Sequence, residues 1–193
     1  MPVSLPDLIK TENKNHLIFD FDATIARLVI DWKLWHVGVA NIIRKFEPNF
    51  IYEGGRMDLR LNGYIKKYGN ELRDTVRGFN AFYENQNITH VLYNVPLISL
   101  IKKLGSYKSY IYSSNSRYTI KPILKKLKID ECFVKYICLE DVIYRKPDPD
   151  GLQQIIAPNV ALSEYLMIGD SEATDGDAAR AVGVDFFLIT MKK

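Results

Sequence analysis

The sequence predicts an α/β fold with a Rossmann-like parallel sheet that is interrupted by a helical insertion. Short apolar runs of strand length occur at 17–19 and then, after residue 94, in alternation with segments of helical spacing. The segment 27–93 instead reads as helical and strand-poor. Strands that alternate with helices form parallel sheets with right-handed crossovers. With 193 residues, 47% of them hydrophobic, the chain is long and apolar enough to bury one such core.

The first predicted strand, 17–19, runs directly into Asp20 and Asp22. Side chains alternate along a strand, so these two carboxylates would leave it on the same face. Two like charges that lie this close need a cation or a shared proton. Mg²⁺ takes hard oxygen ligands and often only one or two carboxylates, so this pair is a candidate magnesium site. An acidic turn after a strand is the alternative.

The insertion predicts a succession of helices. Asp31 can cap the first, and Pro48 should stop it. The second covers 57–68 and ends at Gly69. The third covers about 71–85, with Leu72, Val76, Phe79, Phe82 and Tyr83 on one side. A further helix, 96–104, follows the insertion and has Pro96 in its first turn.

The C-terminal half alternates between strands and helices. Strands are predicted within 109–116, where a hydroxyl and amide cluster ends the strand, and at 133–139, 165–168 and 185–190. Helices are predicted at 118–128, 151–157 and 175–182. Parallel strands end at one shared edge, so Asp20, Asp22, Ser114, Asn115 and Asp170 should converge there.

Composition excludes several classes of protein. A net charge of +3 does not indicate nucleic-acid binding, and the lysines of 118–128 read as a solvated face. Cys132 and Cys138 lack the spacing of zinc pairs and are expected to be reduced thiols. No apolar stretch has the length of a membrane span, and the N-terminus does not resemble a secretory signal. We therefore expect a cytoplasmic protein, either a monomer or a homodimer.

Four short segments carry a specific resemblance. Their order and spacing resemble the four motifs of the haloacid dehalogenase superfamily, and they are Asp20–Thr24, Ser114–Asn115, Lys146–Pro149 and Gly169–Asp175. The resemblance covers about 17–190 except the insertion, which lies where members of this superfamily carry a helical cap. It implies a core of 1–26 and 94–193 and an all-helical cap of 27–93.

The resemblance also implies roles for individual residues. Asp20 would be the nucleophile that forms an aspartyl-phosphate, and Asp22 would act as general acid and then general base. Mg²⁺ would be bound by Asp20, Asp22 and Asp170; for Asp22, the family pattern uses the backbone carbonyl. Asp175 would act behind the metal ligands or through water, although an acid at a helix N-terminus is an equally good interpretation.

The phosphate-binding residues implied by the resemblance are Ser114, Asn115 and Lys146. Ser114 would donate a hydrogen bond to a phosphoryl oxygen, with Asn115 assisting, and Lys146 would bring a compact positive charge. The implied function is a Mg²⁺-dependent phosphatase acting on a small phosphorylated metabolite beneath a closing cap.

The chain departs from the family pattern at two places. Ala23 stands where Gly is usual, which is harmless at negative φ and strained at positive φ. The acidic residue that many phosphoglycolate phosphatases carry soon after the first motif is absent from 25–28. The resemblance to those phosphatases therefore does not extend to their specificity.

Other interpretations remain open. A phosphomutase would keep all four motifs, and a catalytically silent binding module would keep the fold; a dehalogenase is disfavoured because it does not need Asp22. His36 is expected at the rim of a packed pair of tryptophans. Arg27, Lys33 and Arg56 are candidates for binding a substrate carboxylate or second phosphate, although a solvated face is the simpler role for each.

Overall fold

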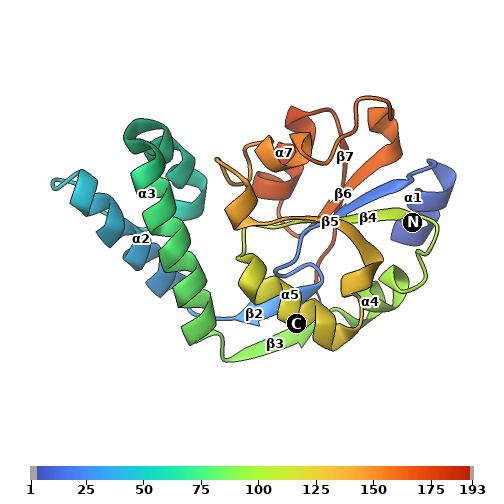
Figure 1. The fold of residues 1–193 in the computed structure, drawn as a ribbon, viewed down its shortest axis with the longest axis horizontal. Coiled ribbons are helices and arrows are strands. Elements are labelled where there is room, and N and C mark those ends of the chain that lie inside the picture. Colours follow the sequence, from blue (N-terminus) through green and yellow to red (C-terminus); the bar gives the residue numbers. More distant parts are fainter. Residues whose placement is uncertain (1–3, 192–193) are drawn as a thin grey trace.

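The computed structural model describes residues 4–191 and has the α/β architecture expected from the sequence. Its core is a parallel sheet of five strands in the order β5-β4-β1-β6-β7, and two long helices stand to one side of this core (Figure 1). The strands are β1 (His16–Phe19), β4 (Lys108–Tyr112), β5 (Phe133–Ile137), β6 (Tyr165–Gly169) and β7 (Asp185–Leu188). The predicted strands are thus confirmed, with ends that differ by a few residues.

Alternate residues of each strand pack on opposite faces of the sheet. Leu17 and Phe19 of β1 belong to a core cluster with α1 (Leu5–Thr11), α4 (Val95–Ile101) and α5 (Arg117–Leu127). The intervening Ile18 packs with α6 (Asp150–Gln153) and α7 (Asp177–Ala181) on the other face. Helices therefore cover both faces, as the alternation of strands and helices requires.

The insertion contains α2 (Trp32–Phe46) and α3 (Met57–Asn87). Asp31 caps α2 by accepting hydrogen bonds from the backbone N–H groups of residues 33 and 34. Gly69 has φ 72° and kinks α3 where the sequence placed the boundary between two helices. The two helices share a hydrophobic cluster that includes Val39 of α2 and Leu72 of α3. We call this unit, α2 and α3 together, the cap.

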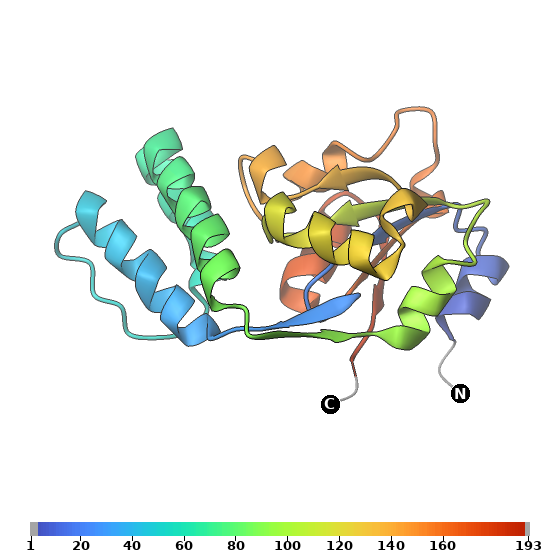
Figure 2. The same ribbon diagram turned by 60° about the horizontal axis from the view of Figure 1, so that its bottom comes forward.

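Two short strands connect the cap to the core. β2 (Ala26–Val29) and β3 (His90–Tyr93) pair in antiparallel register and form a ribbon that runs from the core to the cap (Figure 2). The sequence pattern predicted helices for 27–93 and did not predict this ribbon. Each strand has only four residues, and an apolar stretch as short as 91–93 cannot be distinguished from part of a helix by periodicity alone.

Other elements differ from the predictions in detail. Helix α1 was not predicted, although Ser4 caps it and Leu5 and Ile9 bury its inner face. Helix α6 is shorter than the predicted 151–157. Phe82 was placed on the buried side of α3, but it is exposed; Asn80 and Glu84 are buried on that helix instead.

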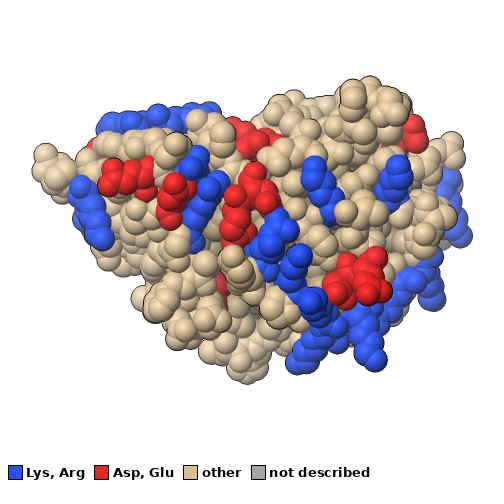
Figure 3. Space-filling model, in the orientation of Figure 1, with Lys and Arg blue, Asp and Glu red and all other residues tan. Residues whose placement is uncertain are grey.

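Lysines gather on the surface around α5. The lysines of α5 are exposed, as is Lys128 directly after it, and basic side chains gather over this region in Figure 3. Cys132 and Cys138 are both free thiols. Within residues 4–191, no helix combines the length and hydropathy that a membrane crossing needs.

Candidate active site

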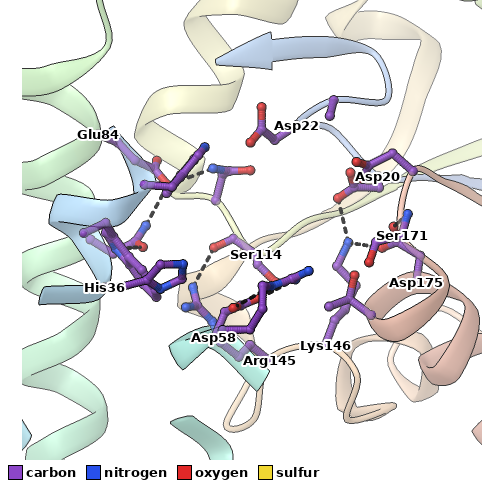
Figure 4. Close-up of a pocket in the computed structure, with 18 residues that line it drawn as sticks. Asp20, Asp22, His36, Asp58, Glu84, Ser114, Arg145, Lys146, Ser171 and Asp175 are labelled. Atoms are coloured by element: carbon purple, nitrogen blue, oxygen red, sulfur yellow. Dashed lines mark hydrogen bonds and ion pairs between the residues drawn. The ribbon is translucent and has the colours of Figure 1, made fainter. Parts of the chain in front are cut away.

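A cavity of about 440 Å³ lies beyond the carboxyl ends of β1, β4 and β6, between the core and the cap (Figure 4). All of the predicted site residues line it, and these are Asp20, Asp22, Ser114, Asn115, Lys146, Asp170 and Asp175. The cap contributes aromatic and polar side chains, among them Trp35, His36, Asp58 and Glu84. The volume is within the range of small-molecule sites, roughly 300–1,000 Å³.

Lys146 is at the centre of the charged groups. Its ammonium Nζ lies 2.6 Å from Asp20 Oδ1 and 2.5 Å from Asp175 Oδ1, and it also donates to the Tyr112 carbonyl oxygen at 3.1 Å. All three charged side chains are buried. Burial alone would lower the pKa of Lys146, but the two carboxylates raise it, so the lysine is charged at neutral pH.

The nucleophile candidate Asp20 is held on both of its oxygens. Oδ1 accepts from Lys146, and Oδ2 accepts from the Thr24 hydroxyl at 3.1 Å. Burial raises the pKa of Asp20, and Lys146 opposes this effect. The contacts fix the carboxylate at the end of β1 and orient it toward the cavity (Figure 4).

Asp22 occupies a different environment from Asp20. Its Oδ1 accepts one hydrogen bond, from the Leu28 backbone N–H at 2.7 Å, and it forms no ion pair with the described residues. Burial raises the pKa of Asp22 to about 7. A carboxyl group with this pKa exchanges a proton readily at neutral pH, which is what general acid–base catalysis needs.

The acidic residues include a group with the composition of a magnesium site. Carboxylate oxygens of Asp20, Asp170 and Asp175 lie within 4.8 Å of one another. The side chain of Asp22 is not in this group; the resemblance assigns the backbone carbonyl of Asp22 to the metal. Carboxylate oxygens are the ligands that Mg²⁺ prefers, so the donor set fits the ion. Asp20 and Asp175 both accept hydrogen bonds from Lys146, and Asp175 also accepts one from the Ser171 backbone N–H. The carboxylate of Asp170 is therefore the one with the fewest protein contacts among the three.

Gly169 makes room for this arrangement. A Cβ atom at this position would overlap the Asp175 carboxylate, so any other residue would displace it. The glycine directly before Asp170 in the fourth motif thus has a steric reason.

The turn after β4 binds the cap as well as lining the cavity. The Asn115 side chain donates to Glu84 Oε1 of α3 at 2.8 Å and accepts from the Ser113 hydroxyl at 3.0 Å. Glu84 Oε2 accepts from the Ser116 backbone N–H at 3.1 Å. The amide of Asn115 is therefore engaged by the cap contact, whereas the Ser114 side chain has no hydrogen bond among the described residues and lines the cavity.

Two buried charged residues of the site, Glu84 and Arg145, were not predicted from the sequence. The signal for Glu84 was its position: Leu72, Val76, Asn80 and Glu84 are spaced by four residues, so polar groups continue an apolar stripe. Arg145 precedes the motif lysine in a loop with no periodic pattern, so no local pattern indicated its burial.

The other candidates divide between the cavity and the surface. His36 and Arg56 line the cavity, and His36 packs against Trp35 with 5.2 Å between ring centroids, as expected. Arg56 pairs with Asp58. Arg27 and Lys33 are not among the lining residues in the described part of the chain.

Ala23 adopts the strained conformation that the sequence left undecided. Its φ is +59°, in the left-handed region. This conformation costs a residue with a Cβ atom roughly 1–2 kcal/mol. The Ala23 backbone N–H donates to the Ala26 carbonyl oxygen at 2.7 Å, so the tight turn forms despite that cost.

The fold and the site together define a hydrolase with a helical cap and a buried aspartate–lysine pair at the ends of a parallel sheet. Residues 17–189 match the family described as haloacid dehalogenase-like hydrolase. This match spans most of the chain, and the protein belongs to that family.

Curated relatives include the pyrophosphatase PpaX of Bacillus thuringiensis (strain Al Hakam). It is 30% identical over 102 residues, which are 52% of this chain and 47% of the relative. PpaX of Bacillus cereus (strain AH820) is 31% identical over 102 residues, with the same coverage. The aligned region thus spans about half the length of the curated relatives.

Solved structures share the fold over most of the chain. A protein described as a haloacid dehalogenase-like hydrolase from Bacteroides fragilis has a TM-score of 0.61 and 25% identity, covering 93% of this chain and 90% of that one. The Bacillus subtilis HAD-hydrolase YfnB, crystallised with magnesium, has a TM-score of 0.51 and 19% identity, covering 94% and 90%.

Proposed function

We propose that this protein is a Mg²⁺-dependent phosphatase that hydrolyses a small phosphorylated molecule through an aspartyl-phosphate on Asp20. The observation that carries the proposal is the contact of Lys146 with both Asp20 and Asp175 inside the cavity that Asp22 also lines. A nucleophile, a fixed positive charge and a proton donor are the groups that phosphoryl transfer needs. The relatives named pyrophosphatase support phosphate chemistry.

In the first step, an Asp20 carboxylate oxygen attacks the phosphorus, and the bond to the leaving-group oxygen breaks. The proton of Asp22 passes to that oxygen, so the leaving group departs as an alcohol. The pKa of Asp22, about 7, leaves part of the enzyme in the protonated form at neutral pH.

In the second step, Asp22 is ionised and takes a proton from water. The water oxygen attacks the phosphorus, and the bond to Asp20 breaks, which returns both carboxylates to their starting states. Lys146 holds Asp20 in place throughout, and Ser114 is available to donate to a phosphoryl oxygen.

Asp20, Asp170 and the backbone carbonyl of Asp22 would hold the magnesium ion, with Asp175 beside them. When bound, Mg²⁺ supplies positive charge that offsets the negative charge of the phosphoryl oxygens. The magnesium-bound crystal of YfnB, which shares the fold, supports this choice of ion.

The test is phosphate release from p-nitrophenyl phosphate and a panel of metabolite phosphates, with Mg²⁺ and with excess EDTA. We expect phosphate release in the presence of Mg²⁺ and none in excess EDTA. Asp20→Asn should lower kcat by at least about 10⁴-fold because the nucleophile is lost. Asp177→Asn, which changes an exposed carboxylate on α7, is the matched control and should keep the wild-type rate.

Turnover by Asp20→Asn at the wild-type rate would contradict the assigned nucleophile. Equal rates in Mg²⁺ and EDTA would contradict the metal requirement. Activity that appears only when a sugar bisphosphate is added would instead assign the protein as a phosphomutase.

A further inference from the structure

Arg145 is a buried cation without a carboxylate partner. Its side chain lines the active-site cavity, yet the residue is only 5% exposed, and it forms no ion pair with any carboxylate in the part of the chain that the structure describes. Every other arginine or lysine that lines the cavity is paired: Lys146 with Asp20 and Asp175, and Arg56 with Asp58.

The side chain is held in place but keeps unused donors. Nη2 donates to the Ser114 carbonyl oxygen at 3.0 Å, and the guanidinium carbon lies 5.3 Å from the centre of the Trp35 ring. Nε is buried and has no hydrogen-bond partner. Asn62 of the cap fixes the backbone of Arg145 from both sides, donating to its carbonyl oxygen at 2.6 Å and accepting from its N–H at 3.1 Å.

The nearby carboxylates do not neutralise this charge by direct contact. Asp58 is bound to Arg56 through bidentate hydrogen bonds. Glu84 accepts hydrogen bonds from Asn115, Ser116, Thr119 and Asn80. Burial lowers the pKa of Arg145, and these two carboxylates offset the effect only in part.

A buried, unpaired cation is unfavourable, and a buried N–H without a partner adds to that cost. An anion delivered by a ligand would remove both penalties, because guanidinium groups bind carboxylate and phosphate oxygens through paired donors. His36, whose Nδ1 is another buried atom without a partner, lines the same cavity.

The position of Arg145 separates it from the phosphoryl-transfer groups. In Figure 4 its contact with Ser114 lies on the side facing His36, whereas Asp20 and Lys146 lie on the other side of Ser114. A substrate whose phosphate sits against Asp20 and Lys146 would extend its leaving group toward Arg145 and the cap.

We propose that Arg145 binds an anionic group on the leaving group of the substrate, either a carboxylate or a second phosphate. The substrates would then be phosphomonoesters that carry a second negative charge. This inference rests on the proposed phosphatase function and adds the class of substrate to it.

The test compares matched substrates with and without the second charge. Plain alkyl phosphates of two to four carbons are compared with the corresponding ω-carboxyalkyl phosphates and α,ω-alkyl bisphosphates, all with Mg²⁺. Wild-type protein should prefer one charged series by about 10- to 100-fold in kcat/KM, the effect of a charge-assisted hydrogen-bonded pair. The preferred series distinguishes a carboxylate from a phosphate, and the preferred length gives the spacing.

The variant Arg145→Gln should reduce this preference to about threefold or less, and Arg145→Lys should retain an intermediate preference because it keeps the charge but not the planar fork. Arg60→Gln is the matched control: it removes an exposed cation of α3 that does not line the cavity, and the preference should persist. Circular dichroism and thermal melting check that each variant is folded.

Two results would overturn the proposal: equal kcat/KM for plain and charged substrates in wild-type protein, or an unchanged preference in Arg145→Gln. If Arg145→Gln does not fold, Arg145→Lys takes its place, and an unchanged preference in that variant would overturn the proposal. Absence of hydrolysis for every ester would refute the phosphatase function itself. Calorimetric binding of the same esters to wild-type protein and to Arg145→Gln would then show whether Arg145 still favours the charged series.

Discussion

Asp22 combines burial with a single hydrogen bond, and this has a cost for stability. Its pKa is about 7 in the folded protein because of burial, above the ordinary value of 3.8. Between these two values the folded state binds more protons at this site than the unfolded state does. The contribution of Asp22 to stability therefore falls as pH rises from about 4 to about 7, and the full cost is present above pH 7.

We predict that Asp22→Asn stabilises the metal-free protein while abolishing turnover. Asparagine keeps the oxygen that accepts from the Leu28 N–H but carries no charge, so the free energy of unfolding at pH 8 should rise by about 1 kcal/mol or more. The measurement is urea unfolding in EDTA, and the gain should shrink as the pH is lowered from 8 to 5. A variant that is less stable than wild type at pH 8 would refute the assigned cost.

Among single residues, the sequence predicted the site residues that belong to one of the four motifs. Asp20, Lys146 and Asp170 were found because strand ends converge and four motifs stand in order. Arg145 was not found, because its burial depends on the packing of Trp35 and Asn62 from the cap, far away in sequence. For Ala23 the sequence showed that a residue with a Cβ atom replaces the usual glycine, but the sign of its φ depends on the geometry of the turn.

The contact between α3 and α5 depends on one carboxylate. Glu84 of α3 is fully buried and accepts from the Ser116 backbone N–H at 3.1 Å and from the Thr119 hydroxyl at 2.6 Å, both at the start of α5. It also accepts from Asn80, which in turn accepts from the Trp35 indole N–H. This network links both cap helices to the turn that presents Ser114.

We predict that Glu84→Gln lowers the free energy of unfolding by about 1–3 kcal/mol, because an NH₂ group would replace an oxygen that accepts two hydrogen bonds. Glu71→Gln, an exposed position on the same helix, is the control and should change stability by less than about 0.5 kcal/mol. Urea unfolding measures both. Equal stabilities for the two variants would show that the network contributes nothing.

The elements themselves were predictable where a pattern is long. Helices α2, α3 and α5 have caps, breakers or periodic apolar faces, and the core strands are apolar runs. The β2–β3 ribbon was not, because strands of four residues are too short for their apolar pattern to be distinguished from that of the flanking helices. Helix α1 is short, and its burial depends on the sheet, which a local pattern does not describe.

Across the whole molecule, the cap touches the core at several separate points. Glu84 binds the start of α5 near the ribbon, Arg77 donates to the Val142 carbonyl oxygen, and Asn62 binds the backbone of Arg145. Contacts at several points along α3 hold the cap over the cavity. Movement of the cap away from the core would have to break these hydrogen bonds, either all together or first at one end of α3.

We predict that Asn62→Ala releases the end of the cap that contacts the loop before Lys146. The Arg145 amide N–H, which donates to Asn62 Oδ1, should then exchange with solvent about tenfold faster, since one buried hydrogen bond is lost. Hydrogen exchange measured by NMR reports this directly. The Ser113 amide, bonded to the Ile137 carbonyl oxygen within the sheet, is the internal reference and should not change.

Unchanged exchange at Arg145 in Asn62→Ala would show that other contacts hold this loop. Faster exchange at both Arg145 and Ser113 would indicate general destabilisation in place of local release.

The ribbon also determines how the insertion leaves and re-enters the core. Val29 of β2 faces His90 of β3 across the ladder, so the two ends of the cap segment are neighbours in space. A two-residue turn suffices to join strands at such a point. In topological terms the cap is an enlarged hairpin loop, and loops are the parts of a fold that change length while the sheet beneath keeps its register. The core can thus keep one catalytic edge under caps of very different size.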